Sequence, residues 1–161
     1  MNSKLIKVGI ADMKITRAPG SLITYALGSC IGVCIYDPNI KLAGMIHIML
    51  PEMPKSGDNN ILKYANTGIP EMVRKMEVFG AMRKRMSAKI AGGAKMFNLP
   101  GDSSFGNIGM RNAERVKSVL TQLGIRVVAQ DVGADYARTM EFDSETGRVI
   151  LRSYGHPEKK F

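Results

Sequence analysis

Cys30 and His47 are of the two residue types that together carry out nucleophilic catalysis. A thiol beside an imidazole is the smallest nucleophile–base pair, because the imidazole can take the proton of the thiol. Gly28 and Ser29 directly precede the cysteine, and they allow a sharp approach of the backbone, whose N–H groups could hold an oxyanion. His156 lies close to the C-terminus, so a Cys–His enzyme would have to use His47.

The turn expected at residues 37–40 determines whether the two side chains meet. Asp followed by Pro favours a type I turn, and loops of residues 38–39 or 37–40 both place Cys30 directly opposite His47. Residues directly opposed on antiparallel strands point to the same face, with Cβ atoms about 4.5–5.5 Å apart. A bulge, for which Gly32 is the candidate, would put them on opposite faces.

Each of these residues also has a purely structural interpretation. A cysteine in an apolar strand is usually a small core residue, and we prefer that interpretation for Cys34. For Cys30 the structural and functional interpretations stand evenly, because the Gly-Ser approach is atypical of a packed strand. His47 lies between two isoleucines and on its own would more often be a core histidine.

Composition favours one globular domain over residues 1–161. The chain is 45% hydrophobic and 23% charged, and its net charge of +9 predicts an acidic partner. Only 6% of residues are aromatic and none is Trp, which argues against nucleic-acid binding by base stacking. Two cysteines without a third ligand nearby make a poor zinc site. No signal peptide is visible, and the uncharged residues 18–36 are too polar for a membrane span, so we expect a cytoplasmic protein.

The elements that must position these residues indicate an α+β fold. Alternating and apolar runs predict strands over residues 5–10, 21–27, 31–36, 41–50, 86–91 and 125–130, with a hairpin of 138–142 and 148–152. Helical periodicity covers residues 59–79 and 107–123. We therefore expect largely antiparallel or mixed sheets packed as a sandwich, with helices outside. Residues 155–161 are polar and predict a frayed, flexible tail.

An ordered set of motifs resembles the CheD family, the chemoreceptor glutamine deamidases of bacterial and archaeal chemotaxis. The motifs are Thr24, LGSC at residues 27–30, HIMLP at 47–51, KYA at 63–65, AKIAGGAKMF at 88–97 and NIGMRN at 107–112. The resemblance runs from about Val8 to Arg152. It implies Cys30 as nucleophile, His47 as general base and acid, and Thr24 as the residue that orients the histidine.

The resemblance implies hydrolysis of a glutamine carboxamide on methyl-accepting chemotaxis receptors through a thioester, without metal or cofactor. It also implies a fold similar to cytotoxic-necrotizing-factor-type deamidases and binding to a CheC-type phosphatase. A non-catalytic adaptor of receptors and that phosphatase is the alternative. Gly28 and Ser29 are candidates for the oxyanion site, and Asn107, Arg111 and Asn112 are candidates for the substrate cleft. The basic stretch of residues 74–95 is typical of a solvated helix end, with docking to an acidic receptor as the second interpretation.

Overall fold

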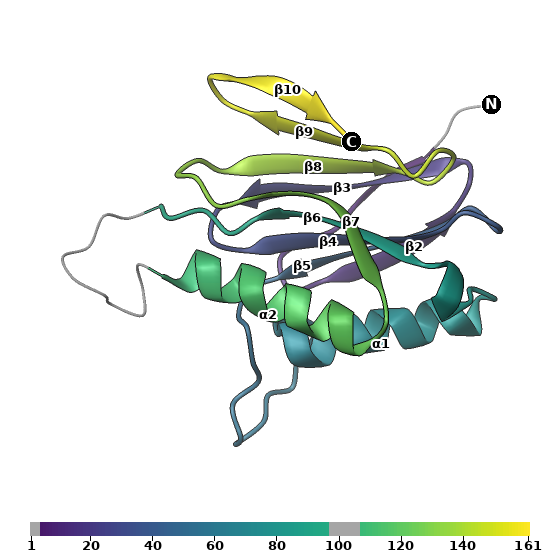
Figure 1. Ribbon diagram of the computed structural model, residues 1–161, viewed down its shortest axis with the longest axis horizontal. Helices are drawn as coiled ribbons and strands as arrows, with labels where there is room; N and C mark the ends of the chain where they lie inside the picture. Colours follow the sequence, from purple (N-terminus) through teal and green to yellow (C-terminus); the bar gives the residue numbers. More distant parts are fainter. Residues whose placement is uncertain (1–3, 97–106) are drawn as a thin grey trace.

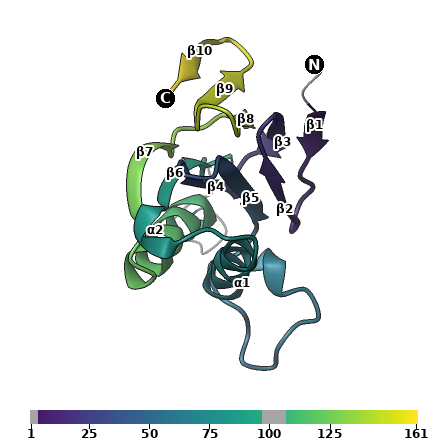
Figure 2. The same cartoon turned by 90° about the vertical axis from the view of Figure 1, so that its right-hand side faces the viewer.

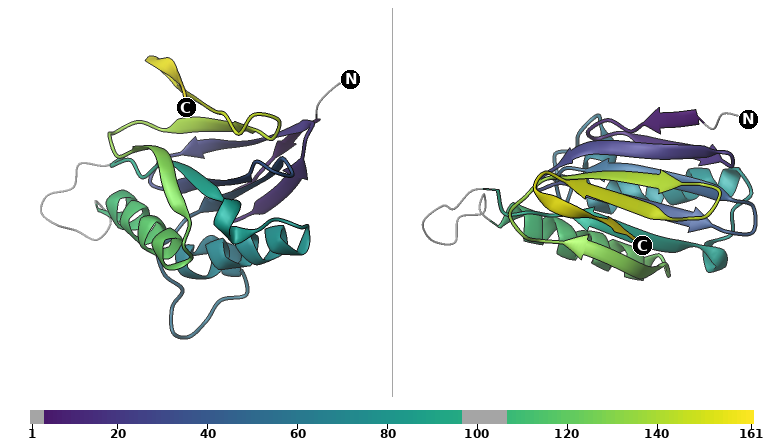
Figure 3. Two further views of the ribbon diagram at one scale, coloured as in Figure 1. Left: turned by 45° about the vertical axis from the view of Figure 1, so that its right-hand side comes forward. Right: turned by 90° about the horizontal axis from the view of Figure 1, so that it is seen from above.

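The computed structural model describes residues 4–96 and 107–161, which form three layers (Figures 1 and 2). Two mixed sheets lie face to face, and two helices cover the outer face of one of them (Figure 3). Phe97, the last residue of one quoted motif, lies outside the described residues. None of the helices in the described ranges is long and apolar enough to cross a bilayer.

The first sheet has the strand order β1-β3-β8-β9-β10. Its strands β1 and β3 are parallel, and all other neighbours are antiparallel. The bounds are Lys4–Lys7 for β1, Gly20–Leu27 for β3, Arg138–Asp143 for β8, Val149–Ser153 for β9 and His156–Lys160 for β10.

The second sheet has the strand order β2-β5-β4-β6-β7. Its strands β6 and β7 are parallel and joined by helix α2, while the other neighbours are antiparallel. The bounds are Met13–Arg17 for β2, Leu42–Ile48 for β5, Ile31–Asp37 for β4, Ser87–Gly92 for β6 and Arg126–Val132 for β7.

Helices α1 (Ala65–Val78) and α2 (Ile108–Gln122) pack on the second sheet. Two short 3-10 helices, Ile61–Lys63 and Arg83–Arg85, flank α1 on either side. The apolar stripe of each helix meets one face of β4, β5 and β6, and this contact forms the larger core. A second core lies between the two sheets and includes Leu22, Leu27, Cys34, Met45, Met140 and Phe142.

The predicted α+β class, the mixed sheets and the two helices are confirmed. Strand β2 was not predicted, because Met13–Arg17 contains only two apolar residues and lies at a sheet edge. The expected helix over residues 59–79 begins later, at Ala65, and contains Pro70.

The expectation of a frayed tail from residue 155 is wrong. His156–Lys160 forms β10, which pairs antiparallel with β9, and the backbones of Phe161 and Val149 exchange two hydrogen bonds of 2.8 and 3.0 Å. Gly155 has φ of +76°, which permits the tight reversal into this strand. The His156 ring also stacks on Tyr136, with centroids 3.8 Å apart. The polar sequence suits an exposed edge strand rather than disorder.

The expected register of the β4–β5 hairpin is also wrong, by two residues. The loop covers four residues, so that Asp37 pairs with Leu42 and His47 pairs with Gly32. Lys41 adopts φ of +49°, and this left-handed residue closes a loop of residues 38–41 instead of the expected 38–39 or 37–40. The ladder has no bulge at Gly32. Because the shift is an even number of residues, each side chain keeps its face.

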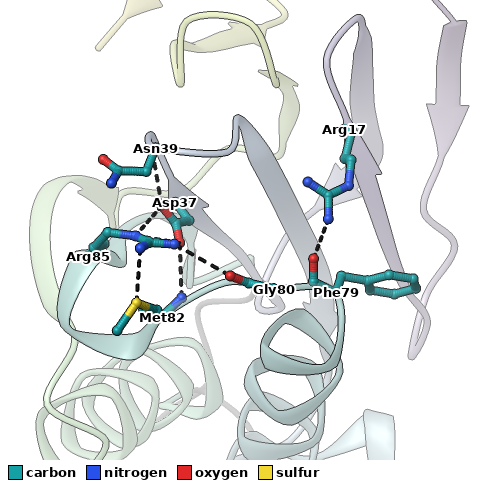
Figure 4. Close-up of polar contacts among 7 residues, drawn as sticks. All are labelled: Arg17, Asp37, Asn39, Phe79, Gly80, Met82 and Arg85. Carbon is teal, nitrogen blue, oxygen red and sulfur yellow. Dashed lines mark hydrogen bonds and ion pairs between the residues drawn. The ribbon is translucent and has the colours of Figure 1, made fainter.

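A buried ion pair fixes this hairpin loop (Figure 4). The carboxylate of Asp37 is fully buried and accepts hydrogen bonds from the Arg85 guanidinium at 2.8–3.1 Å and from the Met82 backbone at 3.0 Å. The same carboxylate accepts from the Asn39 N–H at 3.0 Å, which shapes the turn. Nearby, Arg17 of β2 donates to the carbonyl of Phe79 (Figure 4). Both contacts attach the sheet to the segment that follows α1.

We expect Asp37→Asn to lower the free energy of unfolding by about 2–4 kcal/mol, because the Arg85 charge loses its partner. Burial acts to raise the pKa of Asp37, but the hydrogen bonds from Arg85, Met82 and Asn39 outweigh it and hold the pKa below its usual value. A lowered pKa stabilises the fold above the unfolded-state value of about 3.9, and this stability is lost as the pH falls through the folded-state pKa. Urea unfolding at pH 7 and pH 3 tests this. A variant as stable as the parent at pH 7 would contradict it.

Candidate functional site

The candidate residues Thr24 and His47 meet in the layer between the two sheets. Thr24 comes from β3 of the first sheet and His47 from β5 of the second, and both side chains are fully buried. Cys30 lies in the connection that enters β4, is half-buried, and packs against the core between the sheets. His47 pairs with Gly32, so Cys30, which directly precedes the ladder, is not its direct partner. Diagonal neighbours across two strands have Cα atoms about 7–8 Å apart, farther than directly opposed residues.

Gly32 makes room for this arrangement. A Cβ atom at Gly32 would lie 2.8 Å from the Met140 sulfur and 3.0 Å from a Leu27 methyl group. Gly32, the candidate position for a bulge, therefore lies in a regular ladder, where only a glycine fits beneath the other sheet.

The hydroxyl of Thr24 determines the tautomer of His47. It donates to the Val8 carbonyl at 2.8 Å, and it lies 2.7 Å from Nδ1 of His47. Because a hydroxyl has one proton and a carbonyl can only accept, Nδ1 must carry the proton of the second bond. The other ring nitrogen, Nε2, then has a free lone pair, and no described residue hydrogen-bonds to it. The chain from Val8 through Thr24 leaves His47 as a neutral base.

Burial keeps both groups of the Cys–His pair neutral at rest. It lowers the pKa of His47 from 6.5 to about 4. It also raises the pKa of the Cys30 thiol. At pH 7 the thiol of Cys30 and the imidazole of His47 are therefore both uncharged at rest.

Hydrogen bonds to the backbone carbonyl groups of residues 28–30 hold this segment in place. Ala94 N–H donates to Gly28 O at 2.8 Å, Gly93 N–H donates to Cys30 O at 2.9 Å, and the side chain of Asn112 donates to Ser29 O at 2.9 Å. The N–H of Gly28 donates to Ala26 O at 3.0 Å, so this candidate oxyanion donor is already engaged. The hydrogen bonds between described residues leave the N–H groups of Ser29 and Cys30 available.

The three cleft candidates of α2 occupy different positions. Asn112 is fully buried and reaches the site through two hydrogen bonds of its side-chain N–H₂. Arg111 is exposed and lines an open cavity of about 380 Å³ with neighbours that include Pro51, Glu52 and Arg115. Asn107 is half-buried at the start of α2, and its carbonyl accepts the Arg111 N–H. Asn112 directly contacts the segment that carries the cysteine, through the carbonyl of Ser29.

The basic stretch of residues 74–95 does not form one free surface. Arg74 is paired with Glu71, Arg83 with Glu77 and Arg85 with Asp37. Lys89 donates to the Gly147 carbonyl at 2.8 Å. Several of the cations therefore hold the chain together.

Sequence analysis did not identify Val8 or the bridging function of Asn112. Val8 acts through its backbone carbonyl, which any residue would supply. Asn112 acts on segments 83 and 63 residues away, and only the packing of α2 brings it there. The one available signal was an asparagine on the apolar face of a helix, between Gly109 and Val116.

Comparison with known proteins places the chain among chemotaxis proteins. The family model CheD, described as CheD chemotactic sensory transduction, matches residues 49–153. A protein of Caldanaerobacter subterraneus subsp. tengcongensis called "Probable chemoreceptor glutamine deamidase CheD" is 49% identical over 160 residues, 99% of each chain. A protein of the same name from Lachnoclostridium phytofermentans is 46% identical over 98% of each chain. The family match begins after His47, but these two alignments span almost the whole chain.

A solved structure shares the fold at low sequence identity. The crystal structure of a Neisseria meningitidis protein of the family DUF152 aligns with a TM-score of 0.53 and 10% identity. The alignment covers 82% of this chain and 64% of the other. At this identity the likeness concerns the fold alone.

Proposed function

The chain belongs to the CheD family, and from this membership we propose that it hydrolyses glutamine side chains of chemoreceptors to glutamate. The observation that carries the mechanism is the hydrogen-bonded chain from the Val8 carbonyl through Thr24 to His47. It leaves a neutral imidazole nitrogen, Nε2, in the same layer as a half-buried thiol. This arrangement supports covalent amide hydrolysis by a Cys–His pair.

The first half of the reaction forms a thioester. The sulfur of Cys30 attacks the carboxamide carbon of the glutamine while Nε2 of His47 takes the thiol proton. The oxyanion of the tetrahedral intermediate accepts hydrogen bonds from the N–H groups of Ser29 and Cys30. His47 then gives its proton to the amide nitrogen, the C–N bond breaks, and ammonia leaves.

The second half restores the thiol. Water attacks the thioester carbon and gives a proton to Nε2 of His47. The C–S bond breaks, glutamate is released, and the proton returns to Cys30. Thr24 keeps Nδ1 protonated throughout, so that the same nitrogen acts as base and acid in each half-reaction.

Mass spectrometry of receptor peptides incubated with the protein tests the proposal. Each deamidated glutamine gains about 1 Da, as replacement of an amide by an acid requires. Glutamine peptides that stay unchanged at all protein concentrations would favour the alternative, a non-catalytic adaptor.

The contact with Thr24 predicts graded effects of substitution. We expect Thr24→Val to lower kcat by about 10–100-fold, because His47 loses the partner that fixes its tautomer while the β-branched shape is kept. Thr24→Ser keeps the hydroxyl and should retain much of the activity. Turnover and melting temperature of both variants are the measurements. If the valine variant were as active as the parent, Thr24 would have only a packing function.

Further properties implied by the family form part of the same proposal. We expect a cytoplasmic location, where thiols stay reduced, and a fold shared with cytotoxic-necrotizing-factor-type deamidases, which the layered arrangement of two mixed sheets supports.

We also propose binding to a CheC-type phosphatase. A groove between β2 and the end of α1 supports binding of an acidic partner, since Val78 and Phe79 are exposed there beside Lys14 and Lys75.

A further inference from the structure

The β4–β5 ladder ends just before the proposed nucleophile. Its last pair is Ile31 with Ile48. Cys30 comes directly before Ile31 on one chain, Met49 comes directly after Ile48 on the other, and both residues lie outside the strands. No further rung fixes the separation of the two chains at this point. The distance from nucleophile to base therefore depends on what holds the chains beyond the last pair.

The amide of Asn112 bridges these two chains. Its Nδ2 donates to the Ser29 carbonyl at 2.9 Å and to the Met49 carbonyl at 2.9 Å. One carbonyl belongs to the residue before Cys30, and the other belongs to the residue two positions after His47. Both N–H bonds of the amide are thereby used, one on each chain.

Burial shows that this amide is not a substrate contact. Asn112 is fully buried, and its Oδ1 has no hydrogen-bond partner among the described residues. A buried amide with an unpaired acceptor is unfavourable compared with an apolar side chain of the same size. The two donated bonds are what distinguish asparagine from leucine at this position.

Helix α2 can present Asn112 because its first turn lies against the end of β6. A Cβ atom at Gly109 would lie 2.5 Å from the Ala94 carbonyl oxygen and 2.6 Å from Gly93. Glycine thus permits backbone contact between helix and strand. The backbone N–H groups of Gly93 and Ala94 also hold the carbonyls of Cys30 and Gly28, but neither reaches the chain of His47.

We propose that Asn112 is a positioning residue, whose two hydrogen bonds set the separation of Cys30 and His47 where the β4–β5 ladder ends. The inference rests on the proposed function, since it takes Cys30 and His47 as the reacting pair. It assigns the second asparagine of the NIGMRN motif, Asn112, to positioning of the reacting pair rather than to the substrate cleft.

Asn112→Leu tests the proposal because it keeps the branched shape of the side chain and removes both donors. We expect kcat for deamidation to fall by about 10–100-fold, with KM changed less than about 3-fold. Asn112→Ser is a second, smaller variant; its hydroxyl has one proton, serves one carbonyl at a time, and should lower kcat in the same direction. The matched control is Val116→Ala, one turn along α2 and fully buried. It should lower the melting temperature and leave kcat unchanged.

Alkylation of Cys30 by iodoacetamide gives a readout that needs no receptor substrate. Peptide mass spectrometry separates Cys30 from Cys34, which is buried and whose pKa burial raises well above its usual value. We expect Asn112→Leu and His47→Gln each to slow alkylation at pH 7 by about 10-fold, and the double variant to be no slower than either single variant. Such non-additivity shows that Asn112 acts through the Cys30–His47 pair.

Multiplied losses in the double variant, or an unchanged rate in Asn112→Leu, would overturn the inference and leave the proposed deamidation intact. A different result is that the alkylation rates of the two single variants and the double variant are non-additive, but the protein converts no receptor glutamine. The positioning function would then stand, and the proposed substrate would be wrong.

Discussion

Cys30→Ala is expected to reduce deamidation of receptor peptides to the uncatalysed level while the chain keeps its fold. Without the thiol no thioester forms, and His47 alone has no nucleophile to activate. The side chain is half-buried at the edge of the core between the sheets, so its truncation should cost about 1 kcal/mol or less in the free energy of unfolding. Peptide mass spectrometry and urea unfolding measure the two effects.

Cys34→Ala is the matched control for this experiment. Cys34 is a second free thiol, within β4, and it is buried against Met140, with a sulfur–sulfur distance of 3.9 Å. Its loss should lower the free energy of unfolding by about 1–2 kcal/mol and leave kcat unchanged. Equal activity of the Cys30 variant and the parent would remove Cys30 from the mechanism.

The two thiols show how far the sequence determines the site. An apolar strand predicts a buried Cys34, and the structure confirms its burial. For Cys30 the sequence left the structural and functional interpretations open, and the side chain is half-buried. That Cys30 and His47 share a face stays a prediction, because Cys30 precedes the β4–β5 ladder. Local pattern is sufficient for the burial of Cys34, because strand periodicity is a property of neighbouring residues.

The register could not be obtained in the same way. It depends on the left-handed conformation of Lys41 and on the Asp37 carboxylate, which is held by Met82 and Arg85, residues 45 and 48 positions away. The contacts of Asn112 are similarly remote. Such contacts exist only after the sheets and helices have packed, so a pattern of adjacent residues carries no sign of them.

His47→Gln is expected to lower kcat by about a thousand-fold or more, since glutamine cannot take the thiol proton or protonate the leaving nitrogen. In the parent, the acid limb of kcat/KM should lie near pH 4 rather than 6.5, because burial lowers the pKa of His47 to about 4. Activity between pH 5 and 7 should therefore be nearly constant. His156→Gln, on the exposed strand β10, is the matched control and should retain the activity of the parent.

The same pKa makes a prediction about stability that does not involve catalysis. A histidine whose pKa is lowered by folding stabilises the protein fully above the unfolded-state pKa of about 6.5, and this stability is lost as the pH falls towards 4, because the unfolded chain binds the proton first. Between pH 7 and 4.5 the parent should thus lose more unfolding free energy than His47→Gln. If urea unfolding gave equal losses for both proteins, His47 would not be a buried neutral base, and the proton transfer proposed for its Nε2 would have to be abandoned.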